Sequence, residues 1–226
     1  MKYLLTSLGI TSMLAAAGPT SAAVIFEKIG QTAQVGYEGK VGGSMTDLVS
    51  AQQTFTLTDI SADKKTYTLS YSLDNTSANS SRLRSFGFDV HDATAASIAS
   101  TGAYSFSGVD QNFPEGVGTL SACFAATANG NCTGGPKGLL SGGSALGTIS
   151  LKFATSTDSF SLDNFTTRFQ SIAPSINGES SGVAIGHVAA VPEASTWAMM
   201  IMGVGFLGFT MRRRKTGHSM SPALAA

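Results

Sequence analysis

Residues 178–182 read Gly-Glu-Ser-Ser-Gly and fit the Gly-x-Ser-x-Gly pattern of a hydrolase nucleophile. In that chemistry a strand precedes the serine and a helix follows it. Here Pro174 and an Asn177-Gly178 turn precede Ser180, and a strand pattern follows. No acidic residue stands between Ser180 and His187, the next histidine. The match therefore reads as accidental.

Ser61 and Lys64 fit a second catalytic pattern, Ser-x-x-Lys, but the only Lys-Thr-Gly sequence begins at Lys215, across a predicted membrane span. His91 and His187 read as polar strand residues rather than as bases or metal ligands. We therefore expect no catalytic residues, no enzyme activity and no cofactor.

Turn carboxylates raise the alternative of a calcium site, because hard cations prefer oxygen ligands. The candidate groups are Asp74 with Asn75 and Asn79, Asp89 with Asp92, and Asp158 with Asp163. None has the spacing of a known calcium loop. Solvated turn residues are the preferred interpretation, and no metal site is predicted.

Cys123 and Cys132 are the only cysteines, and they lie within a Gly-rich stretch, residues 108–147. In an exported protein this pair predicts one disulfide, because two thiols without nearby histidines lack the four ligands of a structural metal site. The stretch is longer than a connection requires, which makes it a candidate binding loop.

The N-terminus supports export. Lys2 precedes a short apolar run that stops at Pro19, and small residues follow. This order is typical of a secretory signal peptide, here residues 1–23. An anchor helix or a buried helix is the alternative interpretation.

A second apolar run, residues 195–211, ends at Arg212, Arg213, Arg214 and Lys215. Seventeen helical residues rise about 25 Å, near the lower limit for crossing a hydrocarbon core. The cations act as a membrane stop and place residues 216–226 in the cytoplasm, with the body of the chain outside. A buried core helix is the alternative.

Val191, Pro192, Glu193 and Ala194 stand just before this run. Pro192 cannot continue a helix and favours extended geometry at Val191, as a protease cleft requires. The motif, the apolar run and the basic stop together resemble the PEP-CTERM sorting tail of Gram-negative bacteria, here over residues 191–215. Ala194 stands where many members have proline, which resembles a PEPA-type variant.

The resemblance implies several partners and a location. An exosortase would process the tail near Pro192-Glu193, and the C-terminal helix would hold the precursor in the inner membrane only transiently. The mature protein would then reach the cell surface or extracellular matrix, with a link to exopolysaccharide and biofilm. The Gly-rich stretch with its paired cysteines also resembles the cistern group of these proteins.

Charge agrees with this division of the chain. The whole sequence has 14 Lys plus Arg and 14 Asp plus Glu, but nine cationic and thirteen acidic residues fall within residues 24–190, a net charge of −4. A basic nucleic-acid surface is therefore not expected, and nucleic acid is not a predicted partner.

Residues 24–190 form the predicted body, and their pattern has a period of two. Alternation is clearest at residues 54–58, 66–73, 85–90 and 149–153, with further strands expected at 24–29, 103–106, 160–165 and 183–188. Residues 74–81 read as a polar hairpin loop. No helical pattern competes, so the fold class is all-β, a β-sandwich of jelly-roll type.

The sequence as a whole predicts a non-enzymatic exported surface or matrix protein. A carbohydrate-binding, lectin-like module is the alternative, because jelly rolls commonly carry such sites.

Overall fold

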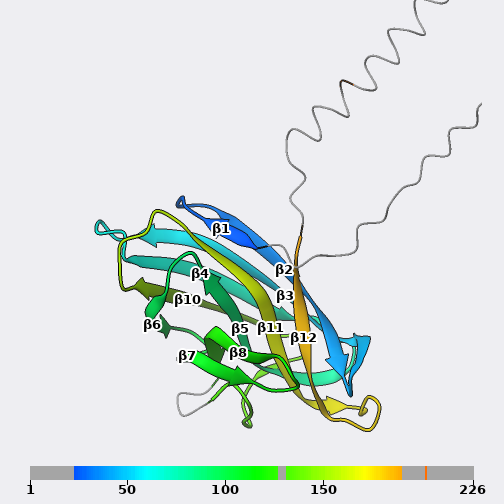
Figure 1. Cartoon of the computed structure of the whole chain (residues 1–226). Helices are drawn as coiled ribbons and strands as arrows, with labels where there is room; N and C mark the ends of the chain where they lie inside the picture. Colours follow the sequence, from blue (N-terminus) through cyan, green and yellow to red (C-terminus); the bar gives the residue numbers. More distant parts are fainter. Residues whose placement is uncertain (1–22, 127–130, 190–201, 203–226) are drawn as a thin grey trace, which may run out of the picture. The chain divides into compact units, whose positions relative to one another are not determined.

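The computed structural model describes residues 23–126 and 131–189, together with residue 202 (Figure 1). Contacts divide the chain between Ala189 and Ala190, and the fold below belongs to the part before that division. Residues 1–22 of the predicted signal peptide and nearly all of the predicted span at 195–211 lie outside the described residues. Within the described residues, no helix is long and apolar enough to cross a membrane.

The described part is built from strands, so the all-β prediction is confirmed. The twelve strands are β1 (Val24–Phe26), β2 (Thr32–Val41), β3 (Ser44–Ile60), β4 (Thr66–Asn75), β5 (Ser80–His91), β6 (Ala95–Ser100), β7 (Phe106–Phe113), β8 (Gly118–Ala125), β9 (Leu139–Leu140), β10 (Ser144–Phe153), β11 (Phe160–Ala173) and β12 (Ser181–Val188).

The arrangement differs from the expected sandwich of two sheets. One antiparallel sheet runs in the order β6-β10-β4-β3-β2-β12-β11-β5-β8-β7, with β1 paired to β11 and β9 paired to β5. The register shifts within the pairs β2–β3, β3–β4 and β11–β5. Such irregularities bend strands and increase their twist, so a single sheet can curve around one core.

The end strands of this sheet, β6 and β7, meet through side chains. Ser107 Oγ donates a hydrogen bond to the Ile98 carbonyl at 3.1 Å, and Ser100 Oγ donates to the Phe106 carbonyl at 3.4 Å. The sheet is therefore nearly closed on itself, with a seam of hydroxyl contacts where a backbone ladder would otherwise run.

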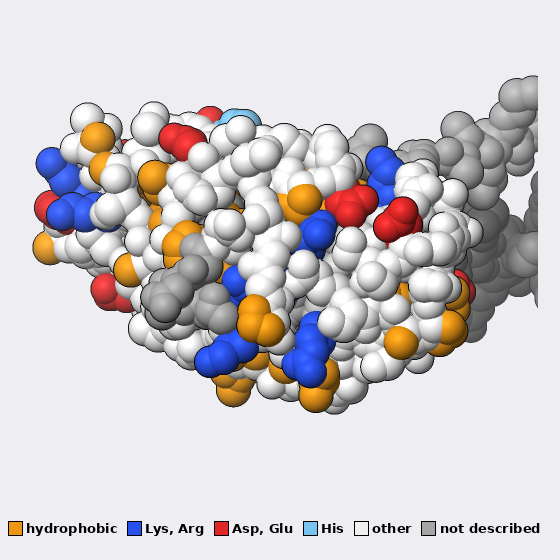
Figure 2. All heavy atoms as spheres, turned by 90° about the horizontal axis from the view of Figure 1, so that it is seen from below, with side chains coloured by type: hydrophobic (Ala, Val, Ile, Leu, Met, Phe, Trp, Pro, Cys, Tyr) orange, Lys and Arg blue, Asp and Glu red, His pale blue; other side chains and the backbone are white. Residues whose placement is uncertain are grey.

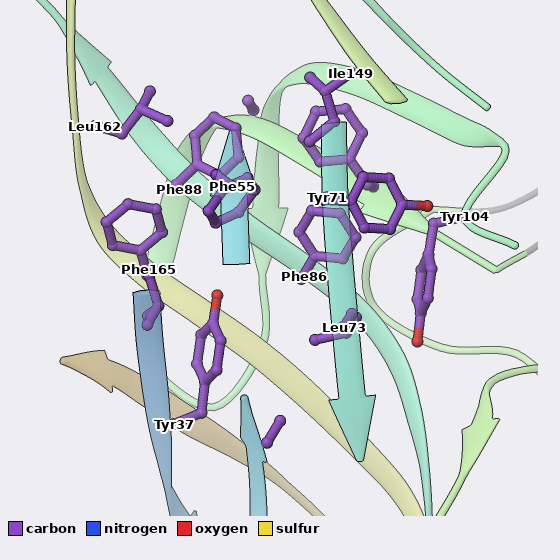
Figure 3. Packing of buried hydrophobic residues seen from close by; sticks show 14 of the residues in the cluster. Tyr37, Phe55, Tyr71, Leu73, Phe86, Phe88, Tyr104, Ile149, Leu162 and Phe165 are labelled. Carbon is purple, nitrogen blue, oxygen red and sulfur yellow. The ribbon is translucent and has the colours of Figure 1, made fainter. Parts of the chain in front are cut away.

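Aromatic side chains fill the interior (Figure 3). Phe55 lies 5.7 Å from Phe88 and 5.7 Å from Phe165, measured between ring centroids. Phe86 lies 5.0 Å from Phe124 and 5.2 Å from Tyr104. These rings come from β3, β5, β8, β11 and the β6–β7 connection, so the core joins strands from both ends of the sheet order.

A second, smaller apolar cluster covers the other face of the sheet near β5 and β8. Phe124 belongs to the main core, and neighbouring strand residues point to opposite faces, so Cys123 and Ala125 lie outside it. The cluster comprises Phe113, Leu120, Cys123, Ala125, Cys132 and Val183. This part of the sheet is therefore buried on both faces.

Most of the expected strands are present, and most have longer bounds than the patterns suggested, although the strand expected at 24–29 ends at Phe26. The exception is residues 103–106, where only Phe106 lies in a strand. Tyr104 instead turns into the core from a loop, and its hydroxyl donates to the Leu83 carbonyl at 2.8 Å. A short polar connection is present where the hairpin loop was expected, since β4 ends at Asn75 and β5 begins at Ser80. It is not a hairpin, because β4 pairs with β3 and β10 whereas β5 pairs with β11, β8 and β9.

Candidate functional site: the disulfide-anchored loop

The predicted disulfide between Cys123 and Cys132 is present. Cys123 lies on β8, both residues are buried, and their Cα atoms are 6.4 Å apart. The bond therefore ties the start of residues 131–138, here called the anchored loop, to the sheet.

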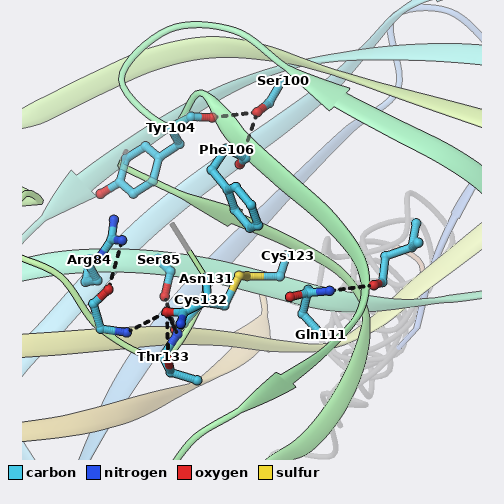
Figure 4. The surroundings of a disulfide bond; sticks show 12 residues. Arg84, Ser85, Ser100, Tyr104, Phe106, Gln111, Cys123, Asn131, Cys132 and Thr133 are labelled. Atoms are coloured by element: carbon cyan, nitrogen blue, oxygen red, sulfur yellow. Dashed lines mark hydrogen bonds between the residues drawn. A yellow bond between two sulfur atoms is a disulfide. The ribbon is translucent and has the colours of Figure 1, made fainter. Parts of the chain in front are cut away.

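Two polar residues of β5 hold the anchored loop (Figure 4). Ser85 Oγ donates to the Cys132 carbonyl at 2.9 Å, and Arg84 Nη2 donates to the Gly134 carbonyl at 2.9 Å. Asn131 Oδ1 also accepts a hydrogen bond from the Gly134 amide at 3.3 Å. The disulfide and these bonds together fix the loop against the outer face of β5.

Arg84 can reach the loop because β5 is irregular there. Leu83 faces Phe169 and Ser85 faces Arg168, so the register of the pair with β11 shifts at Arg84. Arg84 is almost fully buried, and burial lowers the pKa of its guanidinium. Gly135 has a φ of +149°, and a Cβ there would lie 2.7 Å from Arg84 Nη2, so another residue would strain the backbone and displace the guanidinium.

A pocket of about 310 Å³ opens between β5, the anchored loop and the loop before β7. It is lined by Arg82, Ala103, Tyr104, Ala126, Pro136, Lys137, Gly138 and Leu139. Two cations line this pocket and no acidic residue does. Figure 2 shows Lys and Arg side chains among apolar groups on the face seen from below.

Two other pockets in the described part of the chain have different chemistry. One, of about 240 Å³, is uncharged and lies over β2 and β3, with Gln34, Gly36, Gln52 and Thr54 in its lining. The other, of about 420 Å³, includes Glu38 and Asp47. The cationic lining therefore distinguishes the pocket beside the anchored loop from these two.

The sequence analysis expected one long loop over residues 108–147, but that stretch contains β8, β9 and parts of β7 and β10, and the anchored loop is only a short part of it. It also missed Arg82, Arg84 and Lys137 as parts of one site. Arg82 and Arg84 looked like ordinary charges before the Ser85 strand pattern. The available signal was two arginines, separated by one residue, directly before the alternating pattern at residues 85–90. Lys137 lines the same pocket as Arg82 only because the anchored loop folds back against β5.

The Gly-x-Ser-x-Gly match begins in a turn and runs into a strand, as expected. Ile176 and Glu179 form a β-bridge around Asn177 and Gly178, which both have positive φ. Ser180 follows the turn and β12 begins at the next residue. No helix follows the serine, so the backbone is not that of a hydrolase nucleophile.

The other catalytic candidates have ordinary partners. Ser61 Oγ donates to Asp63 Oδ1 at 2.6 Å in a turn, and Lys64 forms an ion pair with Asp158. His187 Nε2 lies 3.8 Å from Glu38 Oε2. Ser61 and Lys64 therefore have contacts that a turn residue and a surface cation would have.

Most of the calcium candidates are engaged by protein groups. Asp89 Oδ1 accepts from the Ser121 amide at 2.9 Å, and Asp89 Oδ2 accepts from Asn164 Nδ2 at 2.9 Å. Asp163 lies 2.8 Å from His91 Nε2. Among the described residues, no group of three or more His, Cys, Asp or Glu side chains is arranged to hold a metal ion.

The predicted sorting residues Val191, Pro192, Glu193 and Ala194 lie outside the described residues, as do Arg212, Arg213 and Arg214. The last described residue of the domain is Ala189, whose amide donates to the Gln34 carbonyl at 2.9 Å. The sheet therefore continues to within two residues of the predicted motif.

Comparison with known proteins identifies the tail alone. No curated protein and no solved structure matches the chain. The family model described as the PEP-CTERM protein-sorting motif matches residues 190–215. The chain thus carries a PEP-CTERM sorting motif directly after its β-sheet domain, which indicates an exported protein that an exosortase sorts.

Proposed function

We propose that the protein is a non-enzymatic component of the cell surface or extracellular matrix, linked to exopolysaccharide and biofilm. The sorting motif that follows the last described strand is the observation that carries this proposal. The predicted signal peptide and the disulfide support it, because disulfides persist in oxidising compartments outside the cytoplasm. The membrane-anchored form is then a precursor, and residues 24–190 are the delivered domain.

The proposal is tested by mass spectrometry of the mature C-terminus in cells with and without their exosortase. We expect the exported chain to end near Pro192-Glu193 in the first strain and to retain later residues in the second. Pro192→Ala with Glu193→Ala should block processing, whereas Ser221→Ala, beyond the basic stop, should not. A chain that extends to Ala226 in exosortase-positive cells contradicts the proposal.

A carbohydrate-binding module is the second candidate. The cationic pocket beside the anchored loop favours it, because a recessed site with charged and apolar lining is a form that ligand sites take. Saturable binding of one sugar class on a glycan array supports this candidate. If the protein binds no glycan on the array, the purely structural role is the one that remains.

A further inference from the structure

The structure points to a ligand class for the cationic pocket: we propose that it binds the carboxylate-bearing sugars of an acidic polysaccharide. The inference rests on the proposed function, since it names a matrix partner for the exported domain. In this proposal Arg82 and Lys137 bind the ligand, and the anchored loop positions Lys137.

Charge provides the first step. Arg82 and Lys137 form no ion pair with any described residue, and the pocket lining contains no Asp or Glu. The surrounding domain carries a net charge of −4. A polyanion is therefore repelled by the domain as a whole and attracted where these two cations meet.

The second step is that the backbone brings both cations to the same pocket. Arg82 lies within β5, between Leu140 of β9 and Gln170 of β11. A Cβ on Gly138 would lie 2.7 Å from the Leu83 carbonyl oxygen and 3.2 Å from the Arg82 Cβ. The loop therefore runs directly against β5, so Lys137 is presented beside Arg82.

The third step is the shape and polarity of the remaining lining. Pro136 and Leu139 provide apolar surface next to the cations, and the fully buried Tyr104 lies beneath them. The volume is near the lower end of ligand pockets, about the size that a single sugar ring can fill. A sugar ring has apolar C–H groups as well as its charged substituent, so it matches both halves of the lining. A bare anion would use only the cationic half.

The test measures binding of the full chain, purified in detergent with its disulfide intact, to immobilised polygalacturonate. Arg82→Gln and Lys137→Gln should each weaken binding about tenfold, because each removes one charge-assisted hydrogen bond. Lys152→Gln is the matched control: it removes one exposed cation from β10, outside the pocket, and should change binding less than about twofold. Thermal unfolding by circular dichroism checks that all three variants fold.

Soluble competitors test the sugar component. Polygalacturonate oligomers should displace the chain, whereas neutral dextran should not. Polyphosphate should compete weakly, since it lacks the apolar ring face. Equal competition by polyphosphate overturns the assignment to a sugar carboxylate, and equal effects of all three lysine and arginine variants overturn the pocket itself.

These failures are separable from failure of the proposed function. A chain that is processed near Pro192-Glu193 but binds no polygalacturonate keeps its sorted, exported role and loses this ligand. A chain that binds through Arg82 and Lys137 but retains its tail in exosortase-positive cells shows the reverse.

Discussion

Phe86 packs against four other aromatic side chains of the main core. Its ring contacts those of Phe55, Tyr71, Tyr104 and Phe124, at centroid distances from 5.0 to 6.5 Å. It is fully buried, so a smaller side chain leaves a cavity that the closed sheet cannot easily fill.

Phe86→Ala should lower the free energy of unfolding by about 3–5 kcal/mol, the range for buried aromatic residues. Leu146→Ala is the control, since Leu146 is 72% exposed and should cost less than about 0.5 kcal/mol. Denaturant unfolding followed by circular dichroism measures both. Similar losses for the two variants would show that the aromatic cluster is not the stabilising core.

Two buried tyrosines predict sensitivity to alkali. Burial raises the pKa of Tyr37 and of Tyr104 far above the ordinary value near 10. In the unfolded chain both phenols ionise near pH 10, so the unfolded state then binds fewer protons than the folded state. The stability that the neutral phenols provide is complete below about pH 10 and is lost as the pH rises above it.

Tyr37→Phe should therefore reduce the loss of stability above pH 10 by about 1.4 kcal/mol per pH unit. At neutral pH it should cost about 1 kcal/mol, because the hydrogen bond from Tyr37 to Gln53 Oε1 is removed. Denaturant unfolding at a series of pH values tests this expectation. An unchanged slope above pH 10 contradicts it.

At the scale of elements, alternation of apolar and polar residues predicts strands that have one face exposed to solvent. It fails where other residues cover that second face. β4 alternates throughout its length between buried and half-buried residues, and its pattern was clear from the sequence. β5 has six consecutive buried residues, from Leu83 to Phe88. The second, smaller apolar cluster covers the other face of β5 and causes this run of buried residues. No local sequence pattern shows that a loop returns to cover a strand.

The strands missed by the sequence analysis were missed for different reasons. β6 consists of Ala, Ser and one Ile, so its apolar face is weak, whereas β2 buries Ala33, Val35, Tyr37 and Val41 at alternating positions, a pattern that was present and overlooked. The candidate site was predicted only in part. The cysteine spacing predicted its disulfide, whereas the pocket depends on pairing between segments distant in the sequence.

The anchored loop should depend on its disulfide. Replacing both Cys123 and Cys132 with alanine should lower stability by roughly 2–3 kcal/mol, the value for closing a loop of this length. It should also weaken polygalacturonate binding, since Lys137 is then less restrained. Unfolding and binding of the oxidised and reduced wild-type chain provide the comparison, and unaltered stability after reduction would contradict the prediction.

Glycines within the strands have unequal roles. A Cβ at Gly147 of β10 would lie 2.3 Å from the Thr101 carbonyl oxygen and 2.5 Å from the Tyr71 hydroxyl oxygen. Gly36 of β2 has no atom within 4 Å of the same position. We expect Gly147→Ala to cost about 1–3 kcal/mol, whereas Gly36→Ala should not destabilise. Melting temperatures of the two variants decide this, and equal values would be evidence against the close packing at Gly147.

At the scale of the whole molecule, the formal charge of zero combines two different populations. The basic residues at the two ends belong to the predicted signal peptide and sorting tail, and the domain between them is acidic. Export and processing should therefore produce a more acidic protein. Isoelectric focusing of the mature form should give a lower isoelectric point than the full-length precursor, and equal values would indicate that the basic tail is retained.

The hydroxyl seam between β6 and β7 bears on how this domain behaves when many copies are packed together. Strands at the ends of an open sheet offer unpaired backbone groups to which another chain can add. Here Ser100 and Ser107 bring the two end strands together, so each shields the other. We expect a protein delivered at high local density to stay as separate copies, without polymerising through its own β-structure.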